Sequence, residues 1–276
     1  MSKAVILQHV AHLGPGRIVP VFRDFGIPVD LRRLDRGDEV PTDLDDIRCL
    51  IVLGGPMGIA DVGGEKYAYL TKEMDLLHRV VKADRAVLGI GLGAQLLAHT
   101  AGAKVYPNVK MGPPAGHGQP PVPLDPVVPL PEVGWLPVTF PFPGGTEPIV
   151  MGMHDGVNFF HWHYDTFDLP KLPSPPNPPP PPAPPPPTGN ALLSSSKLCR
   201  NQAFRFKNRL FGFQYHIEAD RPGIEAMLDA GKEDVTKVIG PDGAAKVRAD
   251  TAKHYPMYER LGNKILANFV QFLKMY

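Results

Sequence analysis

The sequence contains little cysteine and no long run of apolar or like-charged residues, and each shortage excludes a class of protein. Two cysteines among 276 residues are too few for the disulfide framework of a secreted scaffold and are typical of a reducing compartment. No apolar stretch approaches the ~20 residues of a membrane span, and the N-terminus lacks the pattern of a signal peptide. With 29 basic and 28 acidic side chains, the chain carries no electrostatic signature of nucleic-acid or anionic-membrane binding. We therefore expect a cytoplasmic protein.

Proline, in contrast, is abundant and concentrated in two segments. Of 34 prolines, thirteen lie from Pro170 to Pro187 and twelve from Pro113 to Pro148. We predict proline-rich insertions at about 111–131 and 171–189, in surface connections of one domain that spans 1–276. The run 178–187, all proline except Ala183, favours polyproline II. This run is either a ligand for a proline-recognising module or a tolerated surface insertion, which we favour because loop-closure entropy grows slowly with length.

Outside these segments, short apolar runs alternate with helical periodicity, which predicts parallel strands joined by crossover helices. The fold class expected is α/β, with a doubly wound, mostly parallel central sheet flanked by helices. A C-terminal helical extension is predicted over 222–276. Helices are also predicted over 67–81 and 92–101, and strands over 4–10, 48–53, 86–90, 104–106, 135–140, 159–163, 203–206 and 210–216.

The most informative stretch is the predicted strand–turn–helix Leu88-Gly89-Ile90-Gly91-Leu92-Gly93-Ala94-Gln95. Its glycines suggest a dinucleotide-binding turn, but the third glycine of that fingerprint would fall at Ala94, and no acidic residue closes a following strand. We favour a nucleophile elbow, in which a sharp turn exposes one side chain above the sheet at the start of a helix.

Further short motifs surround this elbow in a definite order. They are Gly54-Gly55-Pro56-Met57-Gly58, Glu132-Val133-Gly134-Trp135, Phe160-His161-Trp162-His163-Tyr164-Asp165-Thr166-Phe167, Asn201-Gln202-Ala203-Phe204 and Gly212-Phe213-Gln214-Tyr215-His216-Ile217-Glu218. Together with the elbow they resemble class I (triad-type) glutamine amidotransferases, in particular stand-alone members similar to the amidotransferase domain of GMP synthase. The resemblance spans nearly the whole chain outside the two insertions. It implies a flavodoxin-like fold and a site that works without a cofactor.

The resemblance also implies roles for individual residues. In the family, a cysteine attacks the side-chain amide of glutamine, a histidine deprotonates the thiol and then protonates the leaving ammonia, and a glutamate orients the histidine. His216 and Glu218 match the last two roles, and their spacing of two places both on one face of an extended chain.

Four further positions are matched to the substrate. By the same resemblance, the backbone N–H groups of Gly55 and Leu92 would hold the oxyanion. Gln95 and the segment around His163 would seat the glutamine.

The cysteine itself is missing, because the elbow residue is Gly91. Residues 88–98 contain no Ser, Thr, Cys or Lys that could replace it. Cys49 lies in a predicted buried strand and Cys199 just before another motif, and we expect both to be inert packing thiols. Water activated by His216 is conceivable, but it forfeits nucleophilic catalysis.

A metal site is the alternative interpretation of the histidine-rich motif. His161 and His163 alternate on a predicted strand and so share a face with Asp165, but no further ligand cluster is adjacent in sequence. The amidotransferase resemblance accounts for these residues without an ion, so we expect no metal. His216 and Glu218 are likewise open to a purely structural interpretation, as a hydrogen-bonded pair.

The leading hypothesis is therefore a class I glutamine amidotransferase-like protein that has lost its nucleophile and is catalytically impaired or inactive. One alternative is an active glutamine or γ-glutamyl hydrolase or transferase that uses a non-standard route. Another is a non-catalytic binding or regulatory module. The expected small-molecule partner is glutamine or a similar compound. The expected protein partner is either a synthetase that accepts ammonia or a proline-recognising module. Neither nucleic acid nor membrane is expected.

Overall fold

The computed structural model describes residues 2–114, 121–171 and 189–275. The run 178–187, expected to adopt polyproline II, lies outside these residues. The helices are α1 (Ile18–Asp24), α2 (Tyr69–Lys82), α3 (Leu92–Thr100), α4 (Arg221–Ala230), α5 (Lys232–Ile239) and α6 (Gly243–Met275). The strands are β1 (Lys3–Gln8), β2 (Val29–Arg33), β3 (Ile47–Val52), β4 (Ala86–Ile90), β5 (Val105–Pro107), β6 (Met111–Pro114), β7 (Pro121–Pro123), β8 (Glu132–Val138), β9 (Val157–His163), β10 (Asp165–Phe167), β11 (Asn190–Ser194), β12 (Ala203–Phe206) and β13 (Leu210–Phe213).

The centre of the molecule is a seven-stranded sheet in the order β11-β12-β13-β4-β3-β1-β2. The five strands from β13 to β2 pair in parallel, whereas β12 at one end of the order pairs antiparallel with both β13 and the edge strand β11. This arrangement confirms the predicted α/β class with a mostly parallel sheet. The carboxyl ends of parallel strands lie along one sheet edge, where open α/β folds bind their ligands.

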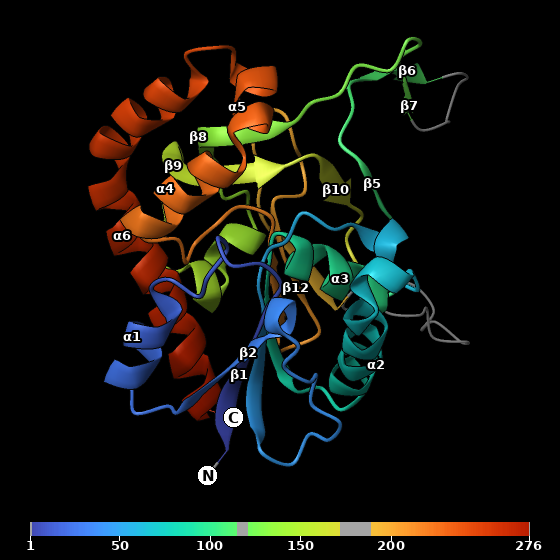
Figure 1. Cartoon of the computed structure of the whole chain (residues 1–276), viewed down its shortest axis with the longest axis vertical. Coiled ribbons are helices and arrows are strands. Elements are labelled where there is room, and N and C mark those ends of the chain that lie inside the picture. The colour runs from blue at the N-terminus through green and yellow to red at the C-terminus, as the bar shows by residue number, and fades with distance from the viewer. Residues whose placement is uncertain (1, 115–120, 172–188, 276) are drawn as a thin grey trace, which may run out of the picture.

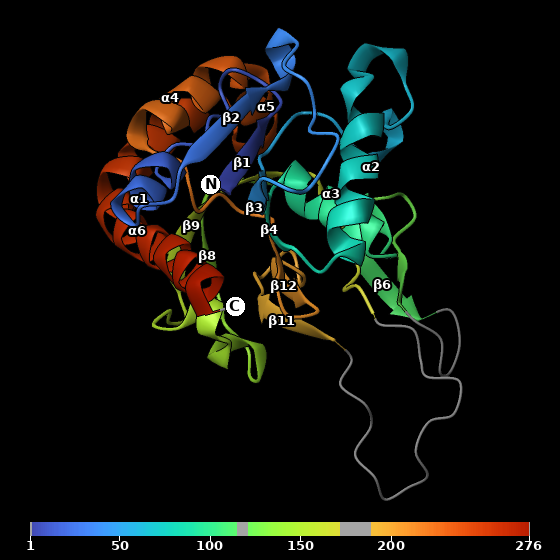
Figure 2. The ribbon, with the colours of Figure 1, turned by 90° about the horizontal axis from the view of Figure 1, so that it is seen from below.

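Helices cover both faces of this sheet, as Figures 1 and 2 show. Helices α1, α4, α5 and α6 lie on one side and α2 and α3 on the other. A hydrophobic core lies on each face of the sheet. Strand β3 contributes to both cores, because alternate side chains of a strand point to opposite faces. Cys49 and Ile51 pack under α1 and α6, whereas Leu50 and Val52 pack under α2 and α3.

A separate hairpin of β8 and β9 packs against α5 and α6. The indole N–H of Trp135 in β8 donates to the hydroxyl of Thr251 in α6 at 2.8 Å. The first proline-rich segment contributes a small ladder of β6 and β7, which extends from the body of the molecule (Figure 1). Among the described residues, no helix is both long and apolar enough to cross a membrane.

The structure agrees with most of the predicted elements and adds several. The strand predicted over 86–90 and the strand predicted over 203–206 have the predicted bounds. Helix α1 was not predicted because it is only seven residues long and contains Pro20, and β2 was missed because its Val-Asp-Leu-Arg-Arg sequence has no buried residue. The last predicted strand is shorter than expected: β13 ends at Phe213, and His216 forms an isolated bridge with Phe160 instead.

Candidate functional site

The candidate site lies where three neighbouring parallel strands end. Gly54 follows β3, Gly91 follows β4 and Gln214 follows β13. The order of these strands in the sheet therefore brings together three segments that are far apart in the sequence.

Gly91 forms the turn between β4 and α3, as the elbow motif predicts. Its backbone has φ 56° and ψ −115°. Residues other than glycine rarely adopt this conformation, which costs them ~1–3 kcal/mol. The N–H of Gly91 donates to the carbonyl of Phe213 at 2.8 Å, which joins the turn to β13. A Cβ atom at this position would meet only the Cα of Gly54, at 3.5 Å. The elbow thus has the shape of a nucleophile turn and open space where the side chain would stand.

The two glycines that flank the elbow have a different role. A Cβ on Gly93 would lie 2.0 Å from the carbonyl oxygen of Val52, and one on Gly89 would lie 2.5 Å from that of Gly93. Close packing of α3 on β3 and β4 therefore requires both glycines. The spacing 89, 91, 93 reflects helix–strand contact together with the turn, and not a phosphate-binding loop.

His216 and Glu218 form a buried pair beside the elbow. The Nδ1 atom of His216 lies 2.7 Å from a carboxylate oxygen of Glu218, whose other oxygen accepts the N–H of Ile217 at 2.9 Å. The side chains of the pair are each 3% exposed. Because the carboxylate can only accept, Nδ1 carries the hydrogen and Nε2 is left to take up a proton.

A cavity of about 450 Å³ joins these elements, within the size range of small-molecule sites. Every residue that the sequence analysis assigned to the site lines it except Glu218, which stands behind His216. The lining is His12, Leu13, Gly54, Gly55, Pro56, Met57, Gly58, Gly91, Leu92, Gln95, Trp162, His163, Tyr164, Asp165, Gln214, His216, Met227, Ala230, Gly231 and Asp234.

Helices α4 and α5 complete the wall of this cavity, and their contribution was not foreseen from the sequence. Burial and the neighbouring Asp234 on α5 raise the pKa of Tyr164 to about 12. Burial also raises the pKa of Asp165, against the opposing charge of His163. Among the described residues, no lysine or arginine lines the cavity, whereas Asp165 and Asp234 do. This balance suits a ligand that carries an amino group.

Gln214 is a second unforeseen feature of the site, because no sequence motif assigned it a role there. Gln95 donates from its amide nitrogen to the amide oxygen of Gln214 at 3.3 Å. The amide nitrogen of Gln214 is buried and has no partner among the described residues. Since buried polar atoms are nearly always paired, this amide is available to a bound ligand.

A third unforeseen feature is a buried His9–Glu73 pair behind the Gly54–Gly55 peptide. His9 lies 2.9 Å from the Glu73 carboxylate through Nε2 and 3.2 Å from the carbonyl of Gly54 through Nδ1. Because a trans peptide directs its C=O and N–H to opposite sides, the N–H of Gly55 points away from His9. The pair therefore orients the peptide whose N–H is expected to hold an oxyanion.

The surroundings of His9 favour its protonated form. Burial by itself disfavours the imidazolium, but the charge of Glu73 and hydrogen bonds to Glu73, Gly54 and Leu53 outweigh it and raise the pKa of His9. Both ring nitrogens then donate, one to the carboxylate and one to the Gly54 carbonyl. No local sequence pattern indicates this pair, because the partner of His9 lies 64 positions away on α2.

His163 is held in the cavity wall by a buried polar network around Glu132. One Glu132 oxygen accepts from Ser196 at 2.6 Å, and the other contacts His163 at 2.9 Å and accepts from Gln202. The second ring nitrogen of His163 lies 3.0 Å from the carbonyl of Asp165. Charge and hydrogen bonding around Glu132 lower the pKa of its carboxyl, although burial acts in the opposite direction.

This network contains the grouping that comes nearest to a metal site in the described part of the chain. It consists of Glu132, His161 and His163, and not of the two histidines with Asp165. Burial lowers the pKa of His161 to about 3, so this ring is neutral at physiological pH. Both oxygens of Glu132 already have partners, one in Ser196 and the other in His163 and Gln202. The structure therefore accounts for this carboxylate without an ion. The expectation of no metal stays a prediction.

Neither cysteine lies at the elbow cavity. Burial raises the pKa of Cys49 to about 12 and that of Cys199 to about 11. Cys49 packs in the core as part of β3, and neither thiol lines the cavity. Both therefore behave as the inert packing residues that the sequence predicts.

Comparison with known proteins agrees with this geometry. Residues 16–227 match the family Glutamine amidotransferase class-I. The chain is 24% identical over 233 residues to the glutamine amidotransferase-like protein YfeJ of Salmonella typhimurium, covering 84% of this chain and 82% of that protein. A glutamine amidotransferase-like protein of Acanthamoeba polyphaga mimivirus, L716, is 32% identical over 74 residues, covering 27% of this chain and 35% of that protein.

Solved structures show the same fold. A glutamine amidotransferase from Thermotoga maritima superposes with a TM-score of 0.72 at 24% identity, with 98% of each chain covered. A GMP synthase subunit from Thermoplasma acidophilum has a TM-score of 0.51 at 21% identity, covering 86% of this chain and 98% of that one. From the family match over residues 16–227 and the shared fold, we conclude that the chain belongs to the class I glutamine amidotransferase family.

Proposed function

We propose that this protein binds the side-chain amide of glutamine, or of a similar γ-glutamyl compound, in the elbow cavity without hydrolysing it by the covalent route. The observation that carries the proposal is Gly91, which stands at the elbow with open space beside a buried His216–Glu218 pair. A base and an oriented oxyanion peptide remain, but no thiol can form the thioester.

The cavity offers matching groups for such a ligand. The N–H of Gly55 and that of Leu92, the first residue of α3, provide donors for the amide oxygen. Asp165 and Asp234 provide carboxylates for an α-amino group. If ammonia is released at all, its acceptor lies on a partner such as a synthetase.

The test restores the missing thiol. Purified wild type, Gly91→Cys and Gly91→Cys/His216→Ala are incubated with glutamine while ammonia and glutamate are measured, and glutamine binding is followed by calorimetry. We expect binding without turnover in wild type, and turnover in Gly91→Cys that the second substitution removes, because the new thiol needs His216 as its base.

Two outcomes contradict the proposal. Turnover by wild type that His216→Ala abolishes would establish an active hydrolase that uses a non-standard route. If glutamine binds neither to wild type nor to a folded Gly91→Cys variant, the cavity serves another ligand. Circular dichroism of each variant shows whether it is folded.

A further inference from the structure

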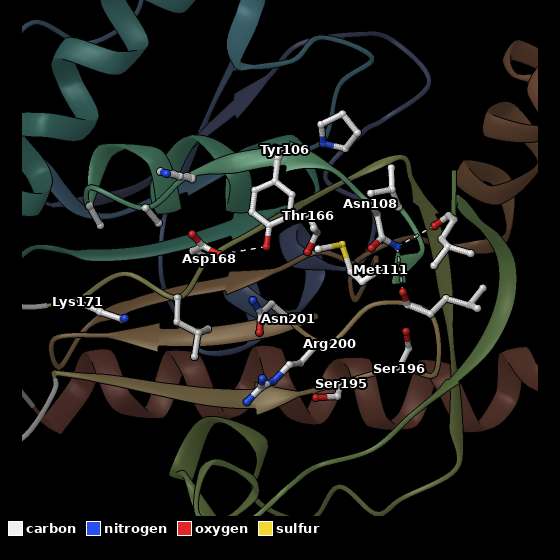
Figure 3. A pocket seen from close by; sticks show the side chains of 18 of the residues that line it. Tyr106, Asn108, Met111, Thr166, Asp168, Lys171, Ser195, Ser196, Arg200 and Asn201 are labelled. Carbon is white, nitrogen blue, oxygen red and sulfur yellow. Dashed lines mark hydrogen bonds between the residues drawn. The ribbon is translucent and has the colours of Figure 1, made fainter. Parts of the chain in front are cut away.

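A larger groove lies beside the candidate site and shares one segment with it. Residues 163–165 line the site, while Thr166, Asp168 and Leu169 of the same segment line the groove. The groove has a volume of about 1630 Å³ and is formed by the C-terminal end of α3, strands β5 and β6 and the loop after β11 (Figure 3). It is also connected to the site through Ser196, which lines it and bonds to Glu132 behind His163.

The groove is strongly basic. Of the described residues, six cationic side chains line it against a single carboxylate, Asp168, which accepts a hydrogen bond from the hydroxyl of Tyr106 at 3.0 Å. Lys207 donates to the carbonyl of Val81, and the remaining five have no ion-pair partner among the described residues. The undescribed segments 115–120 and 172–188 contain no Asp or Glu that could pair with them. The five unpaired cations are Lys104, Lys110, Lys171, Lys197 and Arg200.

Exposed apolar side chains accompany these charges. Four of the large apolar residues that the described chain leaves exposed line this groove, namely Tyr106, Met111, Val127 and Leu198. In Figure 3 the charged ends of Lys171 and Arg200 lie on one side of the pocket and the ring of Tyr106 on the other. Exposed apolar surface with charges around it marks protein interaction sites.

We infer that this groove, lined by Lys104, Lys110, Lys171, Lys197 and Arg200, binds an extended segment of a partner protein that carries acidic and apolar side chains. Charge complementarity selects the acidic residues, and Met111, Val127 and Leu198 accommodate the apolar ones. The inference does not depend on glutamine binding, because none of these residues lines the elbow cavity.

The other anionic ligands fit less well. Single-stranded nucleic acid needs several aromatic platforms on which successive bases stack, and the described wall of the groove offers a single exposed aromatic ring, that of Tyr106. A compact phosphate favours a helix N-terminus, whereas α3 presents its C-terminal residues Thr100–Gly102. The groove is also larger than the ~300–1,000 Å³ typical of small-molecule sites.

The test measures binding of a defined probe by fluorescence anisotropy. The probe is a fluorescein-labelled peptide of repeating Glu-Asp-Leu, with a Lys-Arg-Leu peptide and a single-stranded oligodeoxynucleotide for comparison. The groove variant is Lys110→Glu/Lys197→Glu/Arg200→Glu. Its matched control is Lys232→Glu/Lys237→Glu/Lys253→Glu, in which the same charge change is made at exposed positions on α5 and α6.

We expect the groove variant to weaken binding of the acidic peptide by at least about tenfold and the control variant by less than about twofold. A second variant, Val127→Ser/Leu198→Ser, keeps every charge and weakens the same peptide, which tests the apolar half of the proposal. Equal loss in groove and control variants overturns the inference, as does an oligonucleotide that binds more tightly than the peptide. Glutamine binding by each variant is measured in parallel and stays unchanged, so failure here is distinct from failure of the proposed function.

Discussion

At the scale of single residues, the site is defined by a glycine at the elbow and by the two buried histidine–carboxylate pairs that flank the elbow and the Gly54–Gly55 peptide. Gly91 places no side chain at the elbow, and as a glycine it avoids the strain that a side chain would suffer at φ 56°. The His216–Glu218 pair lies beside the elbow, and the His9–Glu73 pair lies behind the Gly54–Gly55 peptide. Only the first pair was visible in the sequence, because its members are two residues apart.

The raised pKa of His9 predicts how stability depends on pH. The folded state holds the His9 proton more tightly than the unfolded state, so the stabilisation is complete below ~6.5, the ordinary pKa of histidine, and is lost as pH rises through the raised value. Relative to a His9→Gln/Glu73→Gln double variant, wild type should lose up to ~1.4 kcal/mol of unfolding free energy per pH unit in that window. Urea unfolding at a series of pH values measures this difference. A difference that grows with pH contradicts the assignment.

At the scale of elements, the elbow depends on how closely α3 packs against the sheet. The helix begins directly at the turn, and Gly93 in its first turn lies against the carbonyl of Val52 in β3. This contact sets the direction of α3, and hence the position of the Leu92 N–H and of Gln95 in the cavity wall.

Substitution of Gly93 tests this packing. A methyl group there would overlap a backbone carbonyl that has no rotamer by which to move away, so Gly93→Ala should lower the free energy of unfolding by more than about 3 kcal/mol. The matched control is Gly14→Ala, whose Cβ would meet only the amide nitrogen of Gln8, at 3.8 Å, and should change stability by less than about 1 kcal/mol. Urea denaturation followed by circular dichroism measures both. Similar losses in the two variants would show that the close approach is not limiting.

At the scale of the whole molecule, the C-terminal helix α6 is tied to the site through one buried residue, Arg17. Its guanidinium donates to the carbonyls of Glu259 in α6 at 2.6 Å and of Ile217 at 2.7 Å, and it lies 4.4 Å from the ring centre of Tyr258. Ile217 stands between His216 and Glu218, so the docking of α6 and the position of the pair are connected.

Replacement of this residue should therefore affect both stability and the site. Arg17→Met removes the hydrogen bonds to both carbonyls and the contact with the Tyr258 ring, and should cost about 3 kcal/mol of unfolding free energy. In the Gly91→Cys background it should also lower any glutamine turnover, because the His216–Glu218 segment loses its support. Arg248→Met, which removes exposed ion pairs to Glu225 and Asp229, should cost less than about 1 kcal/mol. Thermal and urea unfolding compare the two variants, and equal losses would contradict a special role for Arg17.

Much of the fold and part of the site could be predicted because their signals are local. The apolar run Ala86–Ile90 and the helical periodicity after it mark β4 and α3 wherever they lie in space. Short elements with weak patterns, such as α1 and β2, were not predicted. Seven residues with a proline, or five without a buried residue, carry too little periodicity to be recognised.

Consecutive residues are enough to specify the alternation of strands and helices, the elbow, the His216–Glu218 spacing and the glycine at position 91. The folded chain was needed to show that α4 and α5 wall the cavity, that Glu73 reaches His9, and that cationic side chains gather in one groove. The physical reason is that these contacts join residues far apart in the chain. Their meeting depends on strand order and helix packing, which no local pattern of side chains specifies.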